Sequence, residues 1–284
     1  MHKLDEKAIE FNGAVLAGLK RAISLYYRKS KKLYMTENQA VELFKAEINK
    51  TALTELCPQM FNLTTEMYSD AVKYDWNIEH TRDLEILRNN NVFQVSKYYD
   101  KLESIGMVDE ISKSFQSGGR NVDNILKELK TNIEPIRKTA ISYNKMLVNT
   151  VGQNARNISQ AKDLFTAGFK YSKIVGFRDE LTCPICKKMI GRVFKVSEQI
   201  KVVDQYLSVD YQKLGYEDAI DKIKDIKPWI TLEDAENLPA VDYENDKENY
   251  KDSKILVKKF SPGLLLPSFH ASCRCETKAV ENIN

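Results

Sequence analysis

Two short clusters of cysteine and histidine constrain this chain more than any other feature of its sequence. The first is Cys183-Pro-Ile-Cys186, and the second is His270-Ala-Ser-Cys273-Arg-Cys275. Together they hold all but one of the cysteines. A C-x-x-C pair facing an H-x-x-C-x-C segment is a common way to build a tetrahedral zinc site from two distant loops. A metal ion bound by both clusters would hold Cys186 and His270 close together. The residues between them would then have to form a closed loop.

The two clusters offer five candidate ligands, whereas zinc in a structural site takes four. One possible set contains Cys183, Cys186, His270 and one of Cys273 and Cys275. The other contains all four cysteines, with His270 next to the metal rather than bound to it. We favour a set that includes His270. Disulfides between the clusters, or uncoordinated thiols, are the alternatives to a metal.

The composition of the chain indicates in which cellular compartment these cysteines are found. The chain has 284 residues, of which 43% are hydrophobic and 29% charged, and its net charge is only +3. This charge gives no general argument for nucleic-acid binding, and no stretch approaches the roughly 20 apolar residues of a membrane span. The N-terminal residues lack the apolar segment of a secretory signal. We therefore expect a reducing cytoplasm, where clustered cysteines favour metal over disulfides, and we interpret Cys57 as a small core residue.

The N-terminal region, residues 1–134, is expected to be helical. Apolar residues recur at steps of three and four along the first helix, which ends in the basic run Arg28–Lys32. Such a stripe is more often core than a surface for partner helices. Thr36–Gln39 has the capping-box pattern of a helix start. Ser117-Gly118-Gly119 predicts a break, with a short helix over residues 122–129 after it. The stripe consists of Leu4, Ala8, Phe11, Val15, Leu19, Ala22 and Tyr26.

The module over residues 135–284 begins with the longest predicted helix, residues 135–167. Gly168 is a natural C-cap for it. Its polar face, which includes Asn144, Asn149 and Arg156, is expected to face solvent, although the asparagines leave room for a partner contact. The apolar face consists of Ile136, Ala140, Tyr143, Leu147, Val151, Ala155, Ile158, Ala161 and Phe165.

After Gly168 the pattern changes from helical to extended. Residues 168–196 and 263–284 form the expected β and zinc-cluster part, with strands over 171–177, 192–196 and 275–280. The first cysteine pair would lie in the turn of a zinc-knuckle-like hairpin. Between these parts lies an insertion, residues 197–262, predicted to be helical over 202–226 and an exposed excursion over 231–253. The fold class is therefore α+β: a mainly α-helical N-terminal part followed by a small antiparallel β module with a Cys/His cluster.

The sequence gives little support for catalysis. A catalytic zinc keeps an open coordination position, whereas five candidate ligands favour a closed site. The chain has no H-E-x-x-H, no H-x-E of the zinc deaminases, no Walker A and no G-x-G-x-x-G. We therefore expect that the protein is not an enzyme.

Three motifs follow the long helix in a specific order. They are Asp179-Glu-Leu-Thr-Cys-Pro-Ile-Cys186, Gly191-Arg-Val-Phe194 and Pro267-Ser-Phe-His270-Ala-Ser-Cys273-Arg-Cys275. In this order they resemble the phage head-morphogenesis family, the Mu F-like minor capsid proteins of tailed phages. The resemblance covers roughly half of the chain, and the N-terminal helices carry no matching motif. One proline precedes the histidine where the family often has two, and the link from Phe194 to His270 is longer than expected.

The resemblance implies a minor head protein of a tailed phage or prophage. Such proteins join the procapsid in small numbers, associate with the portal protein, and in some cases leave the head with the DNA. The expected location is the capsid interior near the portal, after assembly in the host cytoplasm. The portal protein is the expected partner, with scaffold, major capsid protein and packaged DNA as further candidates and no membrane. The DNA contact would use basic residues such as those of Arg28–Lys32.

Two other classes of function remain open. A zinc-ribbon-like DNA-binding protein would bind DNA tightly in a salt-sensitive way. An effector enzyme using the cysteine–histidine cluster would lose activity, but not its fold, on substitution of Cys183. A structural zinc predicts the reverse, because removing a ligand removes folding free energy.

Overall fold

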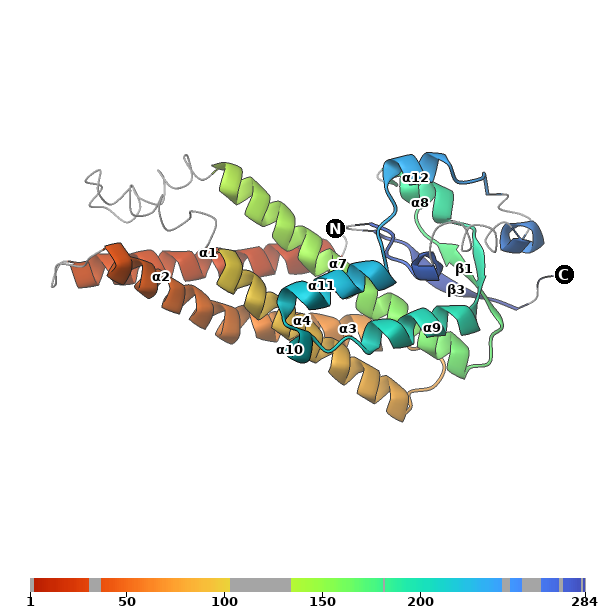
Figure 1. Cartoon of the computed structure of the whole chain (residues 1–284), viewed down its shortest axis with the longest axis horizontal. Coiled ribbons are helices and arrows are strands. Elements are labelled where there is room, and N and C mark those ends of the chain that lie inside the picture. Colours follow the sequence, from red (N-terminus) through yellow and green to blue (C-terminus); the bar gives the residue numbers. More distant parts are fainter. Residues whose placement is uncertain are drawn as a thin grey trace. The chain divides into compact units, whose positions relative to one another are not determined.

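A computed structural model describes residues 3–30, 37–102, 134–180, 182–241, 246–251, 262–270, 273–281 and 283 (Figure 1). The chain divides into two compact units. The first contains Met1–Asn62 and Val92–Val148, and the second contains Leu63–Asn91 and Asn149–Asn284. The sequence suggested a division at residue 134, whereas this division passes through three helices.

The first unit is built from helices. The apolar stripe of α1 is confirmed where its side chains are described, because Leu4, Ala8 and Phe11 are buried. The prediction for Cys57 is also confirmed, since this side chain lies in the core. The predicted capping box at Thr36, the break at 117–119 and the helix at 122–129 lie outside the described residues. The helices that contribute to this unit are α1 (Lys3–Ser30), α2 (Glu37–Thr51), the π-helix η1 (Ala52–Leu56), α3 (Cys57–Ser69), α4 (Ile78–Leu102) and α7 (Glu134–Thr166).

Helices α1 and α2 pack closely against each other within the first unit. Gly18 allows this approach, because a Cβ atom there would lie 2.6 Å from the Thr51 side chain. Arg21 on α1 donates to the Thr51 hydroxyl at 3.2 Å and forms an ion pair with Glu55. Within α7, Asn144 donates to the Asn12 side chain. Apolar packing supported by a few side-chain pairs therefore defines this unit.

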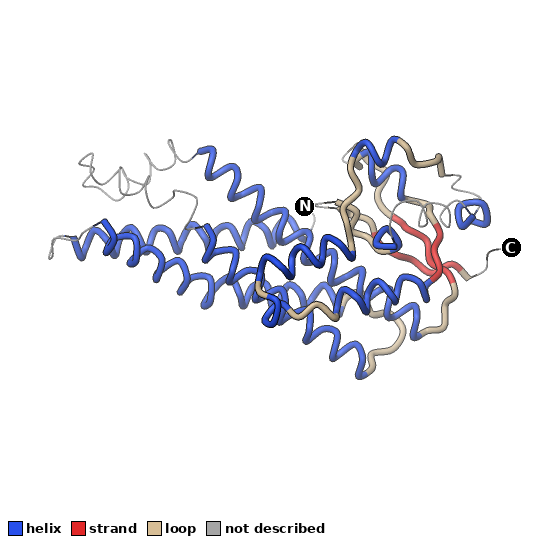
Figure 2. Tube along the Cα trace, viewed as in Figure 1, coloured by secondary structure: helices blue, strands red, loops and turns tan. Residues whose placement is uncertain are grey.

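The second unit contains a three-stranded antiparallel sheet with the order β2-β1-β3 (Figure 2). Ser172 pairs with Phe194 on one side of β1, and Ile174 pairs with Thr277 on the other. The predicted α+β fold class is confirmed: the chain is mostly helical, with a small antiparallel sheet and a Cys/His cluster. The strands are shorter than expected, and they are β1 (Tyr171–Val175), β2 (Val193–Lys195) and β3 (Glu276–Val280).

The first cysteine pair does not lie in a simple hairpin turn, as the sequence suggested. It opens a short helix, α8 (Pro184–Met189), between β1 and β2. The Cys183 Sγ atom caps this helix by accepting a hydrogen bond from the Cys186 backbone amide at 3.3 Å. Pro184 occupies the first turn, where its missing N–H is not needed. Gly191 then takes a positive φ of 96°, which lets the chain return into β2.

The insertion packs onto the sheet instead of standing apart from it. Gln199 on α9 is fully buried, accepts from the Ser172 hydroxyl of β1 and donates to the Leu265 carbonyl. The expected exposed excursion is only partly exposed, because Ala235 and Leu238 are buried. The elements are α9 (Val196–Leu207), α10 (Tyr211–Leu214), α11 (Tyr216–Ile226), α12 (Leu232–Glu236) and the 3-10 helix η3 (Pro262–Leu265).

The long helix α7 is confirmed, and its C-cap Gly168 has the expected positive φ of 80°. The expectation that its polar face meets solvent holds for Lys145, which is exposed, and is wrong for two of its asparagines. Asn144 is 1% exposed and Asn149 is 9% exposed. This face packs against other segments of the chain and supplies their backbone groups with hydrogen-bond partners.

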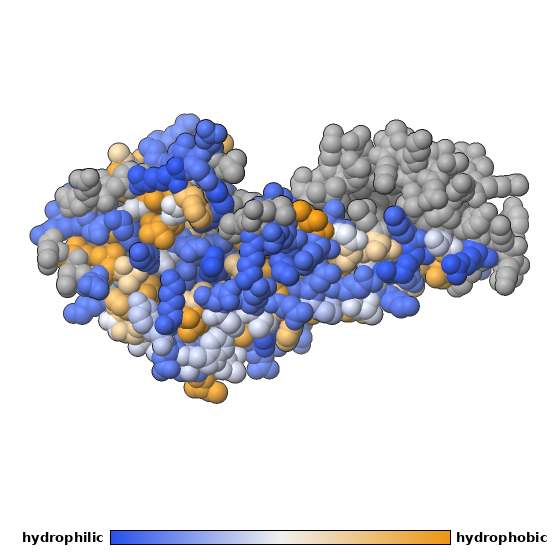
Figure 3. All heavy atoms as spheres, turned by 180° about the vertical axis from the view of Figure 1, so that it is seen from behind, coloured by the Kyte–Doolittle hydropathy of each residue, from blue (hydrophilic) through white to orange (hydrophobic). Residues whose placement is uncertain are grey.

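On the face seen in Figure 3, apolar side chains lie in small groups among polar ones over the part drawn in colour. None of the helices in the described part of the chain is long and apolar enough to cross a bilayer.

Candidate metal centre

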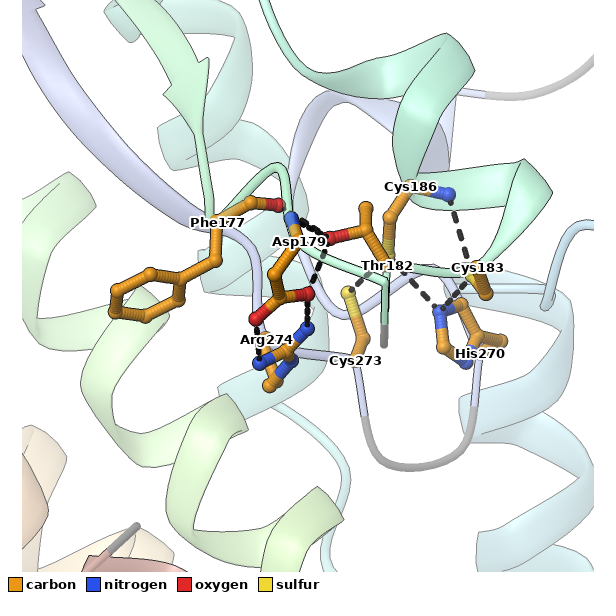
Figure 4. A network of polar contacts seen from close by, with 8 residues as sticks. All are labelled: Phe177, Asp179, Thr182, Cys183, Cys186, His270, Cys273 and Arg274. Carbon is orange, nitrogen blue, oxygen red and sulfur yellow. Dashed lines mark hydrogen bonds and ion pairs between the residues drawn. The ribbon is translucent and has the colours of Figure 1, made fainter.

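The structure brings all five predicted ligands together within the second unit. Figure 4 shows four of them, Cys183, Cys186, His270 and Cys273. The residues Cys183 and Cys186 come from the start of α8. His270 and Cys273 lie in the segment between η3 and β3, and Cys275 immediately precedes β3. Two overlapping groups have their ligand atoms within 4.8 Å of one another, namely Cys183 with Cys186 and His270, and Cys186 with Cys273 and Cys275. Either group could hold a metal ion.

The distances between ligand atoms fit a tetrahedral site. With zinc–sulfur bonds of about 2.3 Å, two bound sulfurs lie roughly 3.8 Å apart. The Sγ atoms of Cys186 and Cys273 are 3.7 Å apart. The His270 Nε2 atom lies 3.0 Å from the sulfurs of both Cys183 and Cys186, about half an ångström closer than in a zinc tetrahedron. A small outward movement would therefore open the tetrahedron.

A cavity of about 30 Å³ adjoins these side chains. This volume is close to that of one water molecule or small ion. Gly176 borders it and has no side chain, and a Cβ atom there would lie 3.0 Å from the Ile190 side chain and 3.5 Å from Cys275 Sγ. The lining residues are Gly176, Phe177, Thr182, Cys183, Cys186, Ile190, His270, Arg274 and Cys275. Soft sulfur and imidazole donors around a small cavity fit a zinc-like ion.

The three most buried thiols do not share charge equally. Hydrogen bonds from the thiols of Cys186 and Cys275 lower the pKa of Cys273. The pKa of Cys186 is raised, chiefly by its hydrogen bond to Cys273, and the pKa of Cys275 is raised by its hydrogen bonds to Cys186 and Cys273. Negative charge is thus concentrated on Cys273, and a metal would have to displace protons from the other thiols that it binds.

A polar network joins the two ligand segments beside the cysteines (Figure 4). Arg274 forms a bidentate ion pair with Asp179, at 2.6 and 2.9 Å, and its guanidinium lies 5.6 Å from the centre of the Phe177 ring. The Thr182 hydroxyl donates to the Phe177 carbonyl and accepts from the Asp179 backbone amide. The turn before the first cysteine pair is therefore fixed to the residue between Cys273 and Cys275.

Side chains of α7 hold the backbone at the other end of the second cluster. Gln153 and Asn157 both donate to the Cys275 carbonyl, at 2.9 and 3.3 Å. Gln160 accepts from the Thr277 backbone amide at 3.0 Å. These contacts satisfy buried backbone groups next to a candidate ligand and fix its position.

The sequence identified the five candidate ligands but not the residues that position them. The sequence motifs include Asp179, Thr182 and Arg274, but the sequence did not indicate what these residues do. Gln153 and Asn157 lie on a helix face that was expected to be solvated, and the sequence carries no signal for the segment that they contact.

Comparisons with known proteins leave the site without a described counterpart. No protein-family model matches the chain, and neither a curated protein nor a solved structure matches it.

Proposed function

We propose that the chain is a minor head protein of a tailed phage, acting at the portal vertex during procapsid assembly, with a C-terminal module held together by a structural zinc ion. The portal protein is its proposed partner, with scaffold, coat protein or packaged DNA as further candidates. In this proposal the cluster has a structural role and performs no catalysis.

One observation carries the proposal: the motif residues that resemble the head-morphogenesis family converge on one site. The first and third motifs are far apart in sequence, yet between them they supply the five candidate ligands and the Asp179–Arg274 pair. Gly191 and Phe194 of the middle motif lie at the entry to β2 and within it. A series of motifs that builds one structural unit is a stronger basis for resemblance than separate short matches.

A closed zinc site is favoured by the burial and number of the donors. Cys186, Cys273 and Cys275 are at most 5% exposed, and five donors are more than a four-coordinate ion needs. The proposed ligands are Cys183, Cys186, His270 and Cys273, since their contacts form a continuous series of 3.0, 3.0 and 3.7 Å. Cys275 would then lie beside the zinc without binding it. A zinc held in this way supplies folding free energy to the module.

The head-protein proposal is tested on intact particles. We would induce the prophage of the strain that encodes the chain, purify particles and quantify this protein against the portal protein by mass spectrometry. A fixed, low ratio to the portal protein is the expected result. Absence from particles that contain portal and coat proteins would contradict a virion location. The zinc is tested separately: metal analysis of the purified full-length chain should give one zinc per chain.

A further inference from the structure

Lys227 is a buried lysine that follows α11 in the second unit. It is 7% exposed, although lysine is among the residues that are rarely buried without a partner. Its backbone amide completes the last turn of α11 through a bond to the Ile223 carbonyl. The chain packs closely here, because a Cβ atom on Gly263 would lie 2.5 Å from the Ile226 carbonyl oxygen and 2.9 Å from the Lys227 Cα atom.

The amine of Lys227 points toward the segment that carries His270. Its Nζ atom donates to the Ser268 carbonyl at 2.8 Å and to the Asn154 side-chain oxygen at 3.2 Å. Nearby, the Ile230 backbone amide donates to the Phe269 carbonyl at 2.9 Å, so the two segments run together up to the ligand. Both acceptors of the amine are neutral groups.

The charged group that acts on the Lys227 amine is the thiolate of Cys273, in the second cysteine cluster. Within the described part of the chain, no carboxylate lies within the 4.0 Å of an ion pair with this amine. Burial lowers the pKa of Lys227, and a negative Cys273 thiolate opposes this by favouring the charged amine, so that the net pKa is about 7. The other cation of the cluster, Arg274, already pairs with Asp179.

We propose that Lys227 is the internal counter-charge of the metal–thiolate centre and strengthens metal binding through its positive charge. This inference rests on the zinc site proposed above. A zinc ion held by three thiolates and one neutral imidazole carries a single net negative charge, and one buried ammonium group neutralises it. A zinc ion held by four thiolates would carry two net negative charges, of which one lysine neutralises only one. The buried lysine therefore also supports the ligand set that contains His270.

The test compares zinc affinities of full-length variants, measured by competition with a chromophoric chelator. Lys227→Gln keeps a donor that can reach the Ser268 carbonyl but removes the charge. Lys224→Gln is the matched control, because Lys224 lies on the same helix, is exposed and pairs only locally with Asp221. We expect Lys227→Gln to weaken zinc binding by tenfold or more, as for other residues that support metal ligands. Lys224→Gln should leave the affinity unchanged.

A cobalt(II) spectrum separates a charge effect from a displaced ligand. The thiolate-to-cobalt absorption of Lys227→Gln should match that of the unsubstituted chain, since the ligand set stays the same. If a folded Lys227→Gln chain binds zinc as tightly as the unsubstituted chain, Lys227 is not the counter-charge. The proposed zinc site is unaffected by that result. Failure of the unsubstituted chain to bind zinc overturns the site itself and the counter-charge with it.

A second measurement does not depend on a variant that folds. In the zinc-loaded chain with labelled lysines, the side-chain NMR resonance of Lys227 at pH 6, below its pKa of about 7, should be that of a charged ammonium group. A neutral amine under these conditions overturns the proposal, because it cannot offset the charge of the thiolates.

Discussion

The two units of this chain bury different kinds of side chain. In the first unit, the described core is mostly apolar and includes Phe11, Leu56 and Met60, each at most 2% exposed. In the second unit, many polar side chains are buried along with the apolar ones. They include Gln153, Asn157, Ser159, Asp163, Arg192, Gln199 and Lys227. The first unit is thus held by non-directional packing, and the second by specific polar contacts.

The polar face of α7 shows what this difference means for specificity. The Asp163 carboxylate accepts hydrogen bonds from the backbone amides of Lys73 and Tyr74, at 2.7 and 3.1 Å. The Ser159 hydroxyl donates to the Tyr68 carbonyl. Together with Gln153, these side chains hold two separate irregular segments. Buried polar contacts add little net stability per bond, but an unsatisfied partner costs much more, so they define one arrangement. A metal bound by the cluster would add folding free energy to this unit.

The largest expected effect comes from removing a metal ligand. Cys183→Ser should unfold the β and cluster part of the second unit and leave α1 and α2 intact. Apparent zinc binding energies of structural sites, about 10–16 kcal/mol, are as large as the stability of a whole domain. Hydrogen exchange followed by mass spectrometry should show protection lost over the strands, the cluster and the helices that pack on them, residues 168–241 and 262–281, and retained in α1 and α2.

Cys57→Ser is the matched control for this variant. Cys57 is buried in the first unit, and its thiol donates to the Val92 carbonyl at 3.7 Å. It should change neither zinc content nor exchange in the second unit. Unchanged protection around Cys183 in the Cys183→Ser chain would show that the two units do not differ in their need for metal.

A smaller effect is expected in the first unit, and it should not depend on metal. Phe11→Ala removes a ring that is 2% exposed, and such truncations cost about 3–5 kcal/mol. Denaturant unfolding of the first unit should show this loss equally with zinc and with a chelator. Ile9→Ala, at a side chain 62% exposed on the same helix, should stay within about 0.5 kcal/mol. A Phe11→Ala effect that grows after zinc removal would mean that the units depend on each other.

The parts of this fold that could be predicted are those with a local signal. The apolar period of α1 and α7, the C-cap at Gly168 and the alternating strands around the cysteine pair all follow from spacing within one segment. The five ligands could be found because cysteine pairs and an adjacent histidine are rare enough to mark a site. The sequence also contains a signal for α8: Pro184 is a residue type that favours the first position of a helix, and it directly follows Cys183, the N-cap in the structure.

The remaining features depend on contacts between distant segments. The amides of Gln153 and Asn157 look solvent-exposed in sequence, because their partner is the carbonyl of Cys275, more than a hundred residues away. Lys227 resembles any surface lysine until the fold buries it. The boundary between the units was missed because α3, α4 and α7 each continue from one unit into the other, so no linker or change in composition marks it.

The smallest expected effect tests whether the polar contacts of the second unit stabilise the metal centre. Gln153→Met keeps the size of a side chain that is 2% exposed but removes the 2.9 Å bond to the Cys275 carbonyl. Asn157 still donates to that carbonyl, so the loss should be about 1 kcal/mol, the typical net contribution of one hydrogen bond. Gln205→Met, on an exposed position of α9, is the control and should be neutral. Zinc release, followed with a chromophoric chelator, should be faster in Gln153→Met than in Gln205→Met. Equal release rates would mean that α7 fixes the backbone of the second cluster without contributing to metal retention, and the polar contacts of this unit would then serve specificity alone.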